Sequence, residues 1–552
     1  MSRIPIRICS CQQAAFSPFA STSRRFASTS SNSTLNSSLN KGKGKAKSKD
    51  KYPGWKPTIG VELHVQLKGN QKLFSKAISQ HDDLSNSHVA LLDASLPGAL
   101  PVLQPNPVRL ALLACLAFES DINLNSSFDR KHYFYPDQPM GYQITQKYAP
   151  LAKGGKIRIR TANGKDAFVE VRLDQVQLEQ DTAKSFHDPS IDGTLIDLNR
   201  AGTALIEIVT QPDLSSAEEA ASFVKTLQAI LRHVGASGAN MERGELRCDV
   251  NVSVQRADDP IGSGTRCEVK NLNGVRFIAG AIESEISRQI SLLTRNEPVI
   301  QSTRGYDALS GKTFHLRSKE DAPDYRYFPD PELGQIAITQ EQLDQLRSTL
   351  PELPEAAFLR LQSEYSLSAR DAGILVALGE GIEEVEGVGE GSASVGVTYF
   401  ERVAKGRESK IAANWVIHEL LGQLTKNGLT LLNNPIKPEE LGQLVDAVTE
   451  NRLTGTNAKA LLRDYLSSSA ASTSPPFSSQ LSTVLDSSPP PPSADSFLPL
   501  ILEIIDSHPS EVEKIKKGQT KVVMRLVGEL MKRSGGKADA KWARKEFEER
   551  LK

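Results

Sequence analysis

The stretch TIGVELHVQL, residues 58–67, alternates strictly between polar or small residues and apolar ones. Its apolar positions are Ile59, Val61, Leu63, Val65 and Leu67. A period of two residues predicts a β-strand with one buried face, because successive side chains of a strand point to opposite sides of the sheet. On the other face, Glu62 and His64 lie about 6–7 Å apart along the strand. We therefore expect a sheet that presents a carboxylate next to an imidazole.

Three further segments have the character of strands. LRCDVNVSV, residues 246–254, and TRCEVKN, residues 265–271, alternate in the same way, and the Gly-, Pro- and Asp-rich loop between them predicts a hairpin. ALIEIVT, residues 204–210, is apolar except for Glu207. The polar faces of the predicted hairpin mix both signs of charge, on Arg247, Asp249, Arg266, Glu268 and Lys270.

Two amphipathic helices interrupt these strands, over residues 216–235 and 275–293. In the first, Ser216 is the expected N-cap, Glu219 completes a capping box, and Gly235 marks the end. Strands and helices do not alternate in a regular rhythm. This favours an α+β fold, with an N-terminal cradle of mostly antiparallel β-sheet and flanking helices, followed by an all-helical part.

We expect four regions along the chain. Residues 51–350 form the cradle, and residues 351–435 and 436–552 form two helical domains. The Ser/Pro-rich stretch at residues 467–496 is of low complexity and is predicted to be a disordered insertion in the last domain. Residues 1–50 precede the folded chain.

The N-terminal region has an unusual composition. Its first 49 residues contain no Asp or Glu, while Arg occurs among Ser, Thr, Ala and apolar residues. This is typical of a mitochondrial transit peptide, although a basic disordered tail is the alternative. The Lys-rich residues 41–51 are then expected to be a solvated linker, with a weak phosphate-attracting arm as the alternative. Cys115, Cys248 and Cys267 follow without CxxC spacing, which excludes a disulfide framework and suits the reducing mitochondrial matrix.

The chain carries 66 basic and 66 acidic residues, so its formal net charge is zero. This excludes nucleic-acid binding through the charge of the whole molecule but permits a local basic patch. Residues 514–545 carry eleven Lys or Arg against two acidic residues, along with an apolar stripe. This pattern has two equally good interpretations, which are a solvated helix face and a docking surface for a phosphate backbone. No apolar run reaches the length of a membrane span.

The segment GYDALSGKT, residues 305–313, superficially resembles a phosphate-binding P-loop. Five residues separate its glycines where the motif has four, and a strand-like run follows it in place of a helix, so we reject that interpretation. The charged strand faces are more informative. Carboxylates suit Mg²⁺ and Arg or Lys suits phosphate, while a solvated face with salt bridges is the commoner alternative.

Two distant segments share one pattern of basic, aromatic, Pro and Asp residues. They are FDRKHYFYPDQP, residues 128–139, and DYRYFPDP, residues 324–331. Pro and Asp at these spacings are common in turns, so two unrelated turns are one interpretation. Two walls of one substrate site are the other.

Eight segments, in this order, together resemble the B subunits of the glutamyl-tRNA(Gln)/aspartyl-tRNA(Asn) amidotransferases. The segments are GVELHVQL, SLPGALPVL, FDRKHYFYPDQPMGYQIT, LEQDTAKS, DLNRAGTALIEIVTQPD, MERGELRCDVNVSV, CEVKNLN and DYRYFPDPEL. The resemblance extends from about residue 57 to the C-terminus and is strongest before residue 335. With the presequence, it indicates the mitochondrial version of the family.

The resemblance implies a function in forming Gln-tRNA(Gln) from mischarged Glu-tRNA(Gln). ATP, with Mg²⁺, phosphorylates the side chain of the tRNA-bound Glu, and ammonia then displaces phosphate. The implied partners are an amidase, which is the A subunit of the enzyme and supplies the ammonia, and a small third subunit, giving a hetero-trimer. The resemblance also favours tRNA binding by the basic C-terminal domain. The rival interpretations are a non-catalytic tRNA-binding scaffold and an ATP-dependent ligase unrelated to tRNA.

The resemblance, together with the polar strand faces, assigns candidate site residues in four groups. The candidate catalytic residues are Glu62, His64, Glu179 and Glu207. The candidate metal ligands are Glu62, His64, Glu179, Asp249 and Glu268. ATP phosphates are assigned to Lys131, Arg247, Lys270 and Asn271, and the acylated tRNA end to Arg130, Tyr133, Tyr135, Arg326 and Tyr327. Gln180 stands where bacterial relatives carry a second Glu and Ala183 replaces a Gly, which leaves the number of metal-binding carboxylates open.

Overall fold

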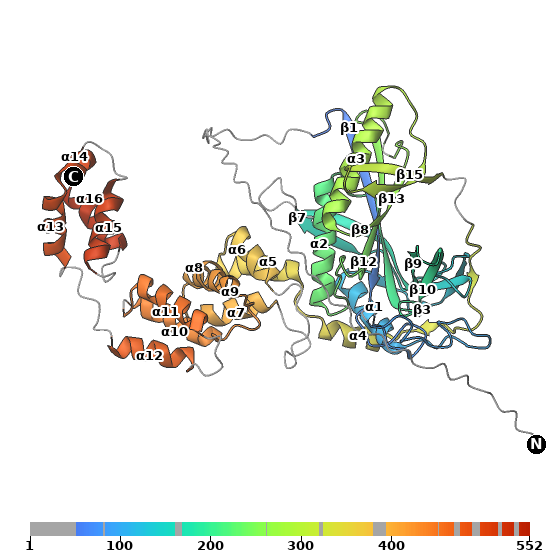
Figure 1. Cartoon of the computed structure of the whole chain (residues 1–552), viewed down its shortest axis with the longest axis horizontal. Helices are drawn as coiled ribbons and strands as arrows, with labels where there is room; N and C mark the ends of the chain where they lie inside the picture. The colour runs from blue at the N-terminus through green and yellow to red at the C-terminus, as the bar shows by residue number, and fades with distance from the viewer. Residues whose placement is uncertain are drawn as a thin grey trace, which may run out of the picture. The chain divides into compact units, whose positions relative to one another are not determined.

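The structure is a computed structural model (Figure 1). It describes residues 51–80, 83–160, 168–260, 262–318, 324–378, 394–450, 452–468, 475–487, 497–516, 522–534 and 540–551. The expected transit peptide and basic linker, residues 1–50, lie outside these residues.

The N-terminal half is built around one large sheet, which has ten strands among the described residues. In spatial order they are β15 (Lys312–Ser318), β14 (Ser302–Asp307), β13 (Cys267–Leu272), β12 (Leu246–Arg256), β1 (Trp55–Gln66), β11 (Ala204–Thr210), β8 (Phe168–Gln180), β6 (Ala152–Lys153) and β2 (Asp121–Ile122), with β7 (Lys156–Arg160) also paired to β8. The β13–β14 pair is parallel and the other neighbours are antiparallel. The expected mostly antiparallel sheet is confirmed.

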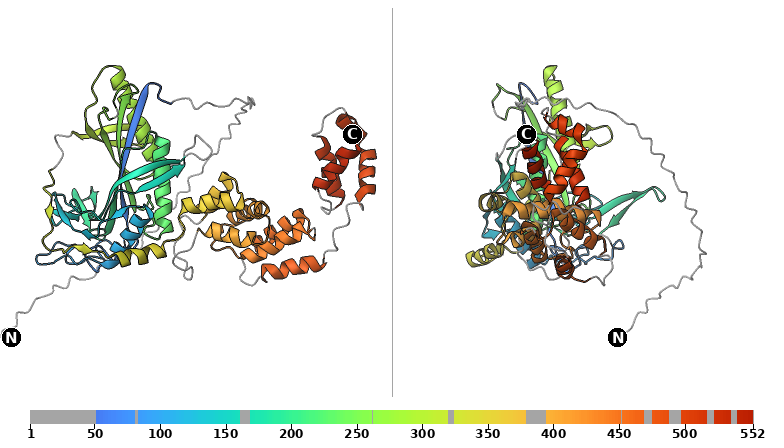
Figure 2. Two further views of the ribbon diagram at one scale, coloured as in Figure 1. Left: turned by 180° about the vertical axis from the view of Figure 1, so that it is seen from behind. Right: turned by 90° about the vertical axis from the view of Figure 1, so that its left-hand side faces the viewer.

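The apolar face of this sheet packs against three helices. They are α1 (Pro105–Ala117), α2 (Ala217–His233) and α3 (Val275–Thr294). Ile59, Leu63 and the other apolar residues of β1 are buried in one core with Phe223 of α2 and Ile282 of α3. Figures 1 and 2 show α2 and α3 along one side of the sheet. Because the helices cover that face, the polar face of β1 is left for other groups.

Three small sheets complete this half. Strand β4 (Asp129–His132) pairs with both β5 (Tyr142–Thr145) and β16 (Phe328–Pro329). The other two sheets are formed by β9 (Lys184–Asp188) with β10 (Gly193–Asp197), and by β3 (Asn125–Ser126) with β17 (Ile336–Ala337). The pairing of β4 with β16 joins the two segments that share an aromatic pattern.

The remaining described chain is helical. Its helices are α4 (Gln340–Thr349), α5 (Pro354–Tyr365), α6 (Ala369–Ala377), α7 (Val395–Ala404), α8 (Ser409–Asn414), the π-helix η1 (Trp415–Leu420), α9 (Leu421–Lys426), α10 (Pro438–Thr449), α11 (Gly455–Ser468), α12 (Phe477–Ser487), α13 (Leu498–Ser507), α14 (Pro509–Lys516), α15 (Val523–Arg533) and α16 (Ala540–Arg550). One hydrophobic core extends from Ala357 to Leu481 and another from Ile501 to Leu551. The expected boundary at residue 435 falls inside the first of these cores.

Several local predictions can be compared with the structure. Ser216 caps α2 by accepting a hydrogen bond from the Glu219 backbone N–H, but the Glu219 carboxylate accepts from Ser215 and does not close the expected capping box. The rejected P-loop segment is part of the β14–β15 hairpin. Helix α12 lies within the stretch that was expected to be disordered, because Phe477 and Leu481 are spaced to bury one helix face.

Candidate active site

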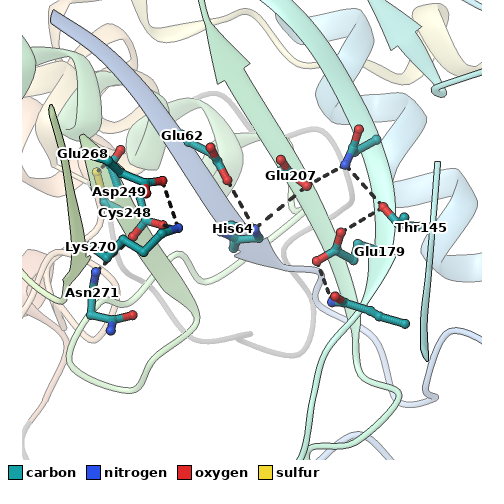
Figure 3. Close-up of polar contacts among 12 residues, drawn as sticks. Glu62, His64, Thr145, Glu179, Glu207, Cys248, Asp249, Glu268, Lys270 and Asn271 are labelled. Atoms are coloured by element: carbon teal, nitrogen blue, oxygen red, sulfur yellow. Dashed lines mark hydrogen bonds and ion pairs between the residues drawn. The ribbon is translucent and has the colours of Figure 1, made fainter. Parts of the chain in front are cut away.

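The centre of the candidate site lies on the polar face of β1 and β11. In the antiparallel register His64 is opposite Glu207, and Glu62 is two residues from His64 on the same face. His64 Nε2 lies 3.9 Å from Glu62 Oε1 and 3.9 Å from Glu207 Oε2, so the imidazole stands between two carboxylates (Figure 3). One ligand atom from each residue lies within 4.8 Å of the others, a spacing that no other trio of His, Cys, Asp or Glu shows among the described residues.

Both carboxyl groups of this trio resist ionisation. Burial, followed by repulsion from Glu207, raises the pKa of Glu62 to about 7. Burial, followed by repulsion from Glu179, raises the pKa of Glu207 to about 7. A divalent cation would relieve this repulsion, and the two carboxylates are ligands that Mg²⁺ prefers. The trio therefore fits a divalent cation, with the imidazole of His64 as a nitrogen ligand less typical of Mg²⁺ than of transition metals.

Glu179 lies next to the trio on β8, with only 2% of its surface exposed. Its Oε1 accepts a hydrogen bond from Gln143 Nε2 at 2.5 Å, and its Oε2 accepts one from Thr145 Oγ1 at 2.8 Å. Gln177 Nε2 in turn donates to Thr145 Oγ1 at 3.3 Å and to Glu207 Oε2 at 2.5 Å. One chain of hydrogen bonds thus fixes the orientation of both carboxylates (Figure 3).

Lys131 lies near the same carboxylates. Burial alone would lower the pKa of the Lys131 ammonium, but attraction to Glu179 and other neighbours outweighs it and the pKa is raised. Its Nζ lies 5.0 Å from the centre of the Tyr325 ring, within the range of a cation–π interaction. The structure thus places a fixed positive charge beside the acidic trio.

The two aromatic-rich segments lie side by side. Arg130 of β4 is opposite Phe328 of β16, which brings tyrosines of both segments together. The ring centres of Tyr133 and Tyr325 are 6.0 Å apart, and those of Tyr325 and Tyr327 are also 6.0 Å apart. Tyr133 Oη donates a hydrogen bond to the Gln143 side chain at 3.0 Å, so this tyrosine cluster is linked to the partners of Glu179.

The remaining substrate candidates are less closely associated with the acidic trio. Arg130 Nε pairs with Asp330 at 2.7 Å, and its guanidinium lies over the Tyr142 ring. Arg130 and Lys131 are neighbours in one strand and therefore point to opposite faces. The Arg326 side chain is 83% exposed, and Tyr135 is half-exposed at the edge of Tyr133.

A second charged group lies on the other side of Glu62. Asp249 is opposite Glu62 in the register of β1 and β12. Its Oδ2 accepts a hydrogen bond from Lys270 Nζ at 2.7 Å, and its Oδ1 accepts one from the Asn271 backbone N–H at 2.9 Å. Lys270 Nζ also lies 2.9 Å from Glu268 Oε1, so both carboxylates are engaged by one lysine (Figure 3). Asp249 and Glu268 are therefore beside the acidic trio and outside it.

Arg247 lies opposite His64 on β12. Its guanidinium pairs with Asp181 Oδ2 at 2.5 Å, and Arg200 lies 3.7 Å from the same oxygen. Burial would raise the pKa of Asp181, but the two arginines outweigh it and the pKa is lowered. Arg247 Nε is buried and has no hydrogen-bond partner in the described structure.

Sequence reasoning missed the polar residues that orient the carboxylates. These are Gln143, Thr145 and Gln177. Asp181, which pairs with Arg247, and Tyr325 of the tyrosine cluster were also missed. Gln177 and Glu179 alternate along the polar face of β8, and this period-two signal could have identified Gln177. Gln143 and Thr145 come from a four-residue strand, which is too short to reveal a face.

The fold and the site together define a class of protein. An antiparallel sheet is covered by helices on one face, and on the other it carries the trio of Glu62, His64 and Glu207, which could hold a cation, with lysines on both sides, an arrangement that suits reactions of phosphate groups. The comparisons with known proteins identify the family. Residues 57–344 match the GatB/GatE catalytic domain, and residues 398–551 match the GatB domain.

Curated relatives match most of the chain. The mitochondrial B subunit of the glutamyl-tRNA(Gln) amidotransferase from Cryptococcus neoformans is 44% identical, over 88% of this chain and 92% of its own length. That from Mycosarcoma maydis is 40% identical, over 96% and 92%. The B subunit of the aspartyl/glutamyl-tRNA(Asn/Gln) amidotransferase from Methylorubrum extorquens is 41% identical, over 88% and 94%.

The chain therefore belongs to the B-subunit family of the glutamyl-tRNA(Gln) amidotransferases, and the resemblance found in the sequence is confirmed. Family membership implies an ATP-dependent activity within a multi-subunit enzyme. The fungal relatives are mitochondrial proteins, in agreement with the mitochondrial location indicated by the presequence. Among the described residues, no helix combines the length and apolarity needed to cross a bilayer.

Proposed function

We propose that this chain uses ATP to phosphorylate the side chain of Glu on mischarged Glu-tRNA(Gln). It then directs ammonia to the resulting acyl phosphate. The observation that carries the proposal is the trio of Glu62, His64 and Glu207, flanked by Lys131 on one side and Lys270 on the other. A cation-binding centre between two lysines suits a reaction between two anions, the γ-phosphate of ATP and a carboxylate.

Each residue is assigned a role that follows from its position. Glu62, Glu207 and His64 hold the Mg²⁺, which when bound neutralises phosphate oxygens. Lys131 and Lys270 attract the negatively charged reactants to the trio from its two sides. The candidate substrate tyrosines, Tyr133 and Tyr327, offer ring faces to the terminal adenine of the tRNA.

The chemistry proceeds in two balanced steps. An oxygen of the glutamyl side chain attacks the γ-phosphorus, the bond to the bridging oxygen breaks, and ADP leaves. Ammonia then attacks the carbonyl carbon of the acyl phosphate, phosphate departs with the C–O bonding electrons, and the nitrogen loses a proton. Glu179 lies beside Glu207 and outside the trio, so we assign it the acceptance of that proton.

The ammonia comes from a partner. We propose that the A subunit of the enzyme, an amidase, is its source, and that a small third subunit completes a hetero-trimer. The helical regions, residues 351–435 and 436–552, are proposed to hold the tRNA, and the basic face of α15 and α16 supplies phosphate contacts.

The test uses the chain co-purified with its partner subunits and supplied with mischarged Glu-tRNA(Gln), ATP, Mg²⁺ and glutamine. Conversion of Glu to Gln on the tRNA is measured together with release of ADP. The Glu62→Ala variant should assemble normally and lose the conversion, whereas unchanged activity would remove Glu62 from the mechanism. A non-catalytic scaffold predicts tRNA binding without ADP release that depends on Glu-tRNA.

A further inference from the structure

The hairpin of β14 and β15 presents an aromatic ring on the same face as the candidate active site. Thr303 of β14 donates a hydrogen bond to Glu268 Oε2 at 3.1 Å, which places the Thr303 side chain on the polar face. Gly305 is two residues further along β14 and therefore belongs to the same face. Phe314 of β15 is the register partner of Gly305, and its side chain is 48% exposed.

Gly305 is the reason that this ring can lie flat on the sheet. A Cβ atom at position 305 would come within 2.5 Å of the Phe314 ring, a distance that real Cβ contacts do not reach. The next residue, Tyr306, has its hydroxyl group next to Gly280 of α3 and so belongs to the opposite, helix-covered face. The absence of a side chain at Gly305 thus allows an aromatic ring to cover the polar face at the edge of the sheet.

Phe314 continues a row of functional groups across the strands. The row begins at Glu62 on β1 and passes through Asp249, its register partner, and Lys270, which binds Asp249. The parallel β13–β14 register pairs Val269 with Arg304, so the next residues along both strands are Lys270 and Gly305. Cation-binding carboxylate, lysine and aromatic ring therefore follow one another from the centre of the sheet to its edge.

This order matches the order of groups in a nucleoside triphosphate. We infer that Phe314 is a stacking platform for the purine base of ATP, with the triphosphate extending past Lys270 toward Glu62 and His64. The inference rests on the proposed function and adds a binding site at the β14–β15 hairpin. Arg317 supports it, because this residue is opposite Thr303 and has no ion-pair partner within the described structure. The tyrosine cluster at the other side of the trio is then left for the RNA.

The test measures ATP binding by the assembled complex. Phe314→Ala should raise the KM for ATP about 5–150-fold, the range expected for loss of one base stack, without changing the KM for Glu-tRNA(Gln). Gly305→Ala should have a similar effect, because it displaces the ring without removing it. Phe277→Ala removes a 45% exposed ring of α3 and serves as the matched control with an unchanged KM.

A fluorescence measurement gives a second readout that does not depend on catalysis. The fluorescence of 2-aminopurine riboside triphosphate should be quenched by the wild-type complex and by the inactive Glu62→Ala complex, but not by the Phe314→Ala complex. An unchanged KM for ATP in Phe314→Ala, or a rise only in the KM for the tRNA, would overturn the inference. Either result would leave the proposed function intact, provided that Glu62→Ala is inactive. Full activity of Glu62→Ala would reject the proposed function.

Discussion

Replacing Glu207 with Gln should make the protein more stable at pH 8, although it removes a candidate catalytic group. The pKa of Glu207 is raised from its ordinary value of 4.5 to about 7 by burial and by repulsion from Glu179. Between these two pH values the folded protein retains a proton that the unfolded chain has already lost. Stability therefore falls as the pH rises through this window, and the loss is complete above pH 7.

The expected size follows from the two pKa values. A pKa difference of about 2.5 corresponds to roughly 3 kcal/mol of unfolding free energy, since each pKa unit is worth about 1.4 kcal/mol. The Gln side chain has a similar shape and cannot ionise, so Glu207→Gln should recover most of this energy at pH 8. At pH 5 Glu207 of the folded wild-type protein is still protonated. Most of the difference in stability between the variant and the wild type should therefore disappear.

The assay is thermal unfolding by calorimetry in EDTA at pH 8 and pH 5. Glu268→Gln is the matched control, because its carboxylate is paired with Lys270 at 2.9 Å and its removal gives no such gain. Adding Mg²⁺ at pH 8 should stabilise the wild-type protein more than it stabilises the Glu207→Gln variant. A Glu207→Gln variant that is no more stable than wild type at pH 8 would refute the electrostatic reasoning.

Three further predictions concern other residues. Gln177→Leu removes the donor to Glu207 Oε2, so the pKa of Glu207 should rise further and the acidic limb of the kcat–pH profile should move to higher pH. Lys131→Met should lower kcat by about 10²–10³-fold while thermal unfolding shows an intact fold. Phe477→Ala should destabilise the helical core by about 3–5 kcal/mol, and an unchanged Tm would show that α12 does not pack there.

Much of the sheet could be predicted because its strands obey a simple period. The alternation around Glu62 identified both the buried face of β1 and the residues opposite it. The same rule predicted the β12–β13 hairpin. It could not predict that β11 lies next to β1, because strand order depends on packing between segments more than a hundred residues apart.

The disorder prediction for residues 467–496 shows the opposite limitation over residues 477–487, whereas residues 469–474 and 488–496 lie outside the described residues. Composition favoured disorder, since Ser and Pro dominate the stretch. A short apolar repeat at Phe477, Leu481 and Val484 is nevertheless sufficient for a helix, because the neighbouring core supplies the surface against which it packs. Average composition hides such a repeat, whereas a search for helical spacing inside the stretch would have revealed it.

The site itself could be predicted only in part, since its chemistry depends on the order of strands. Glu62 and His64 share a strand, but Glu207 joins them only through the pairing of β1 with β11. The same pairing leaves Lys131 on one side of the trio and Lys270 on the other. ATP and a carboxylate repel each other, so a site that receives them from opposite sides keeps them apart until the cation and both lysines neutralise their charge. Under the proposed function, strand order therefore explains how these residues could serve phosphoryl transfer without a P-loop motif.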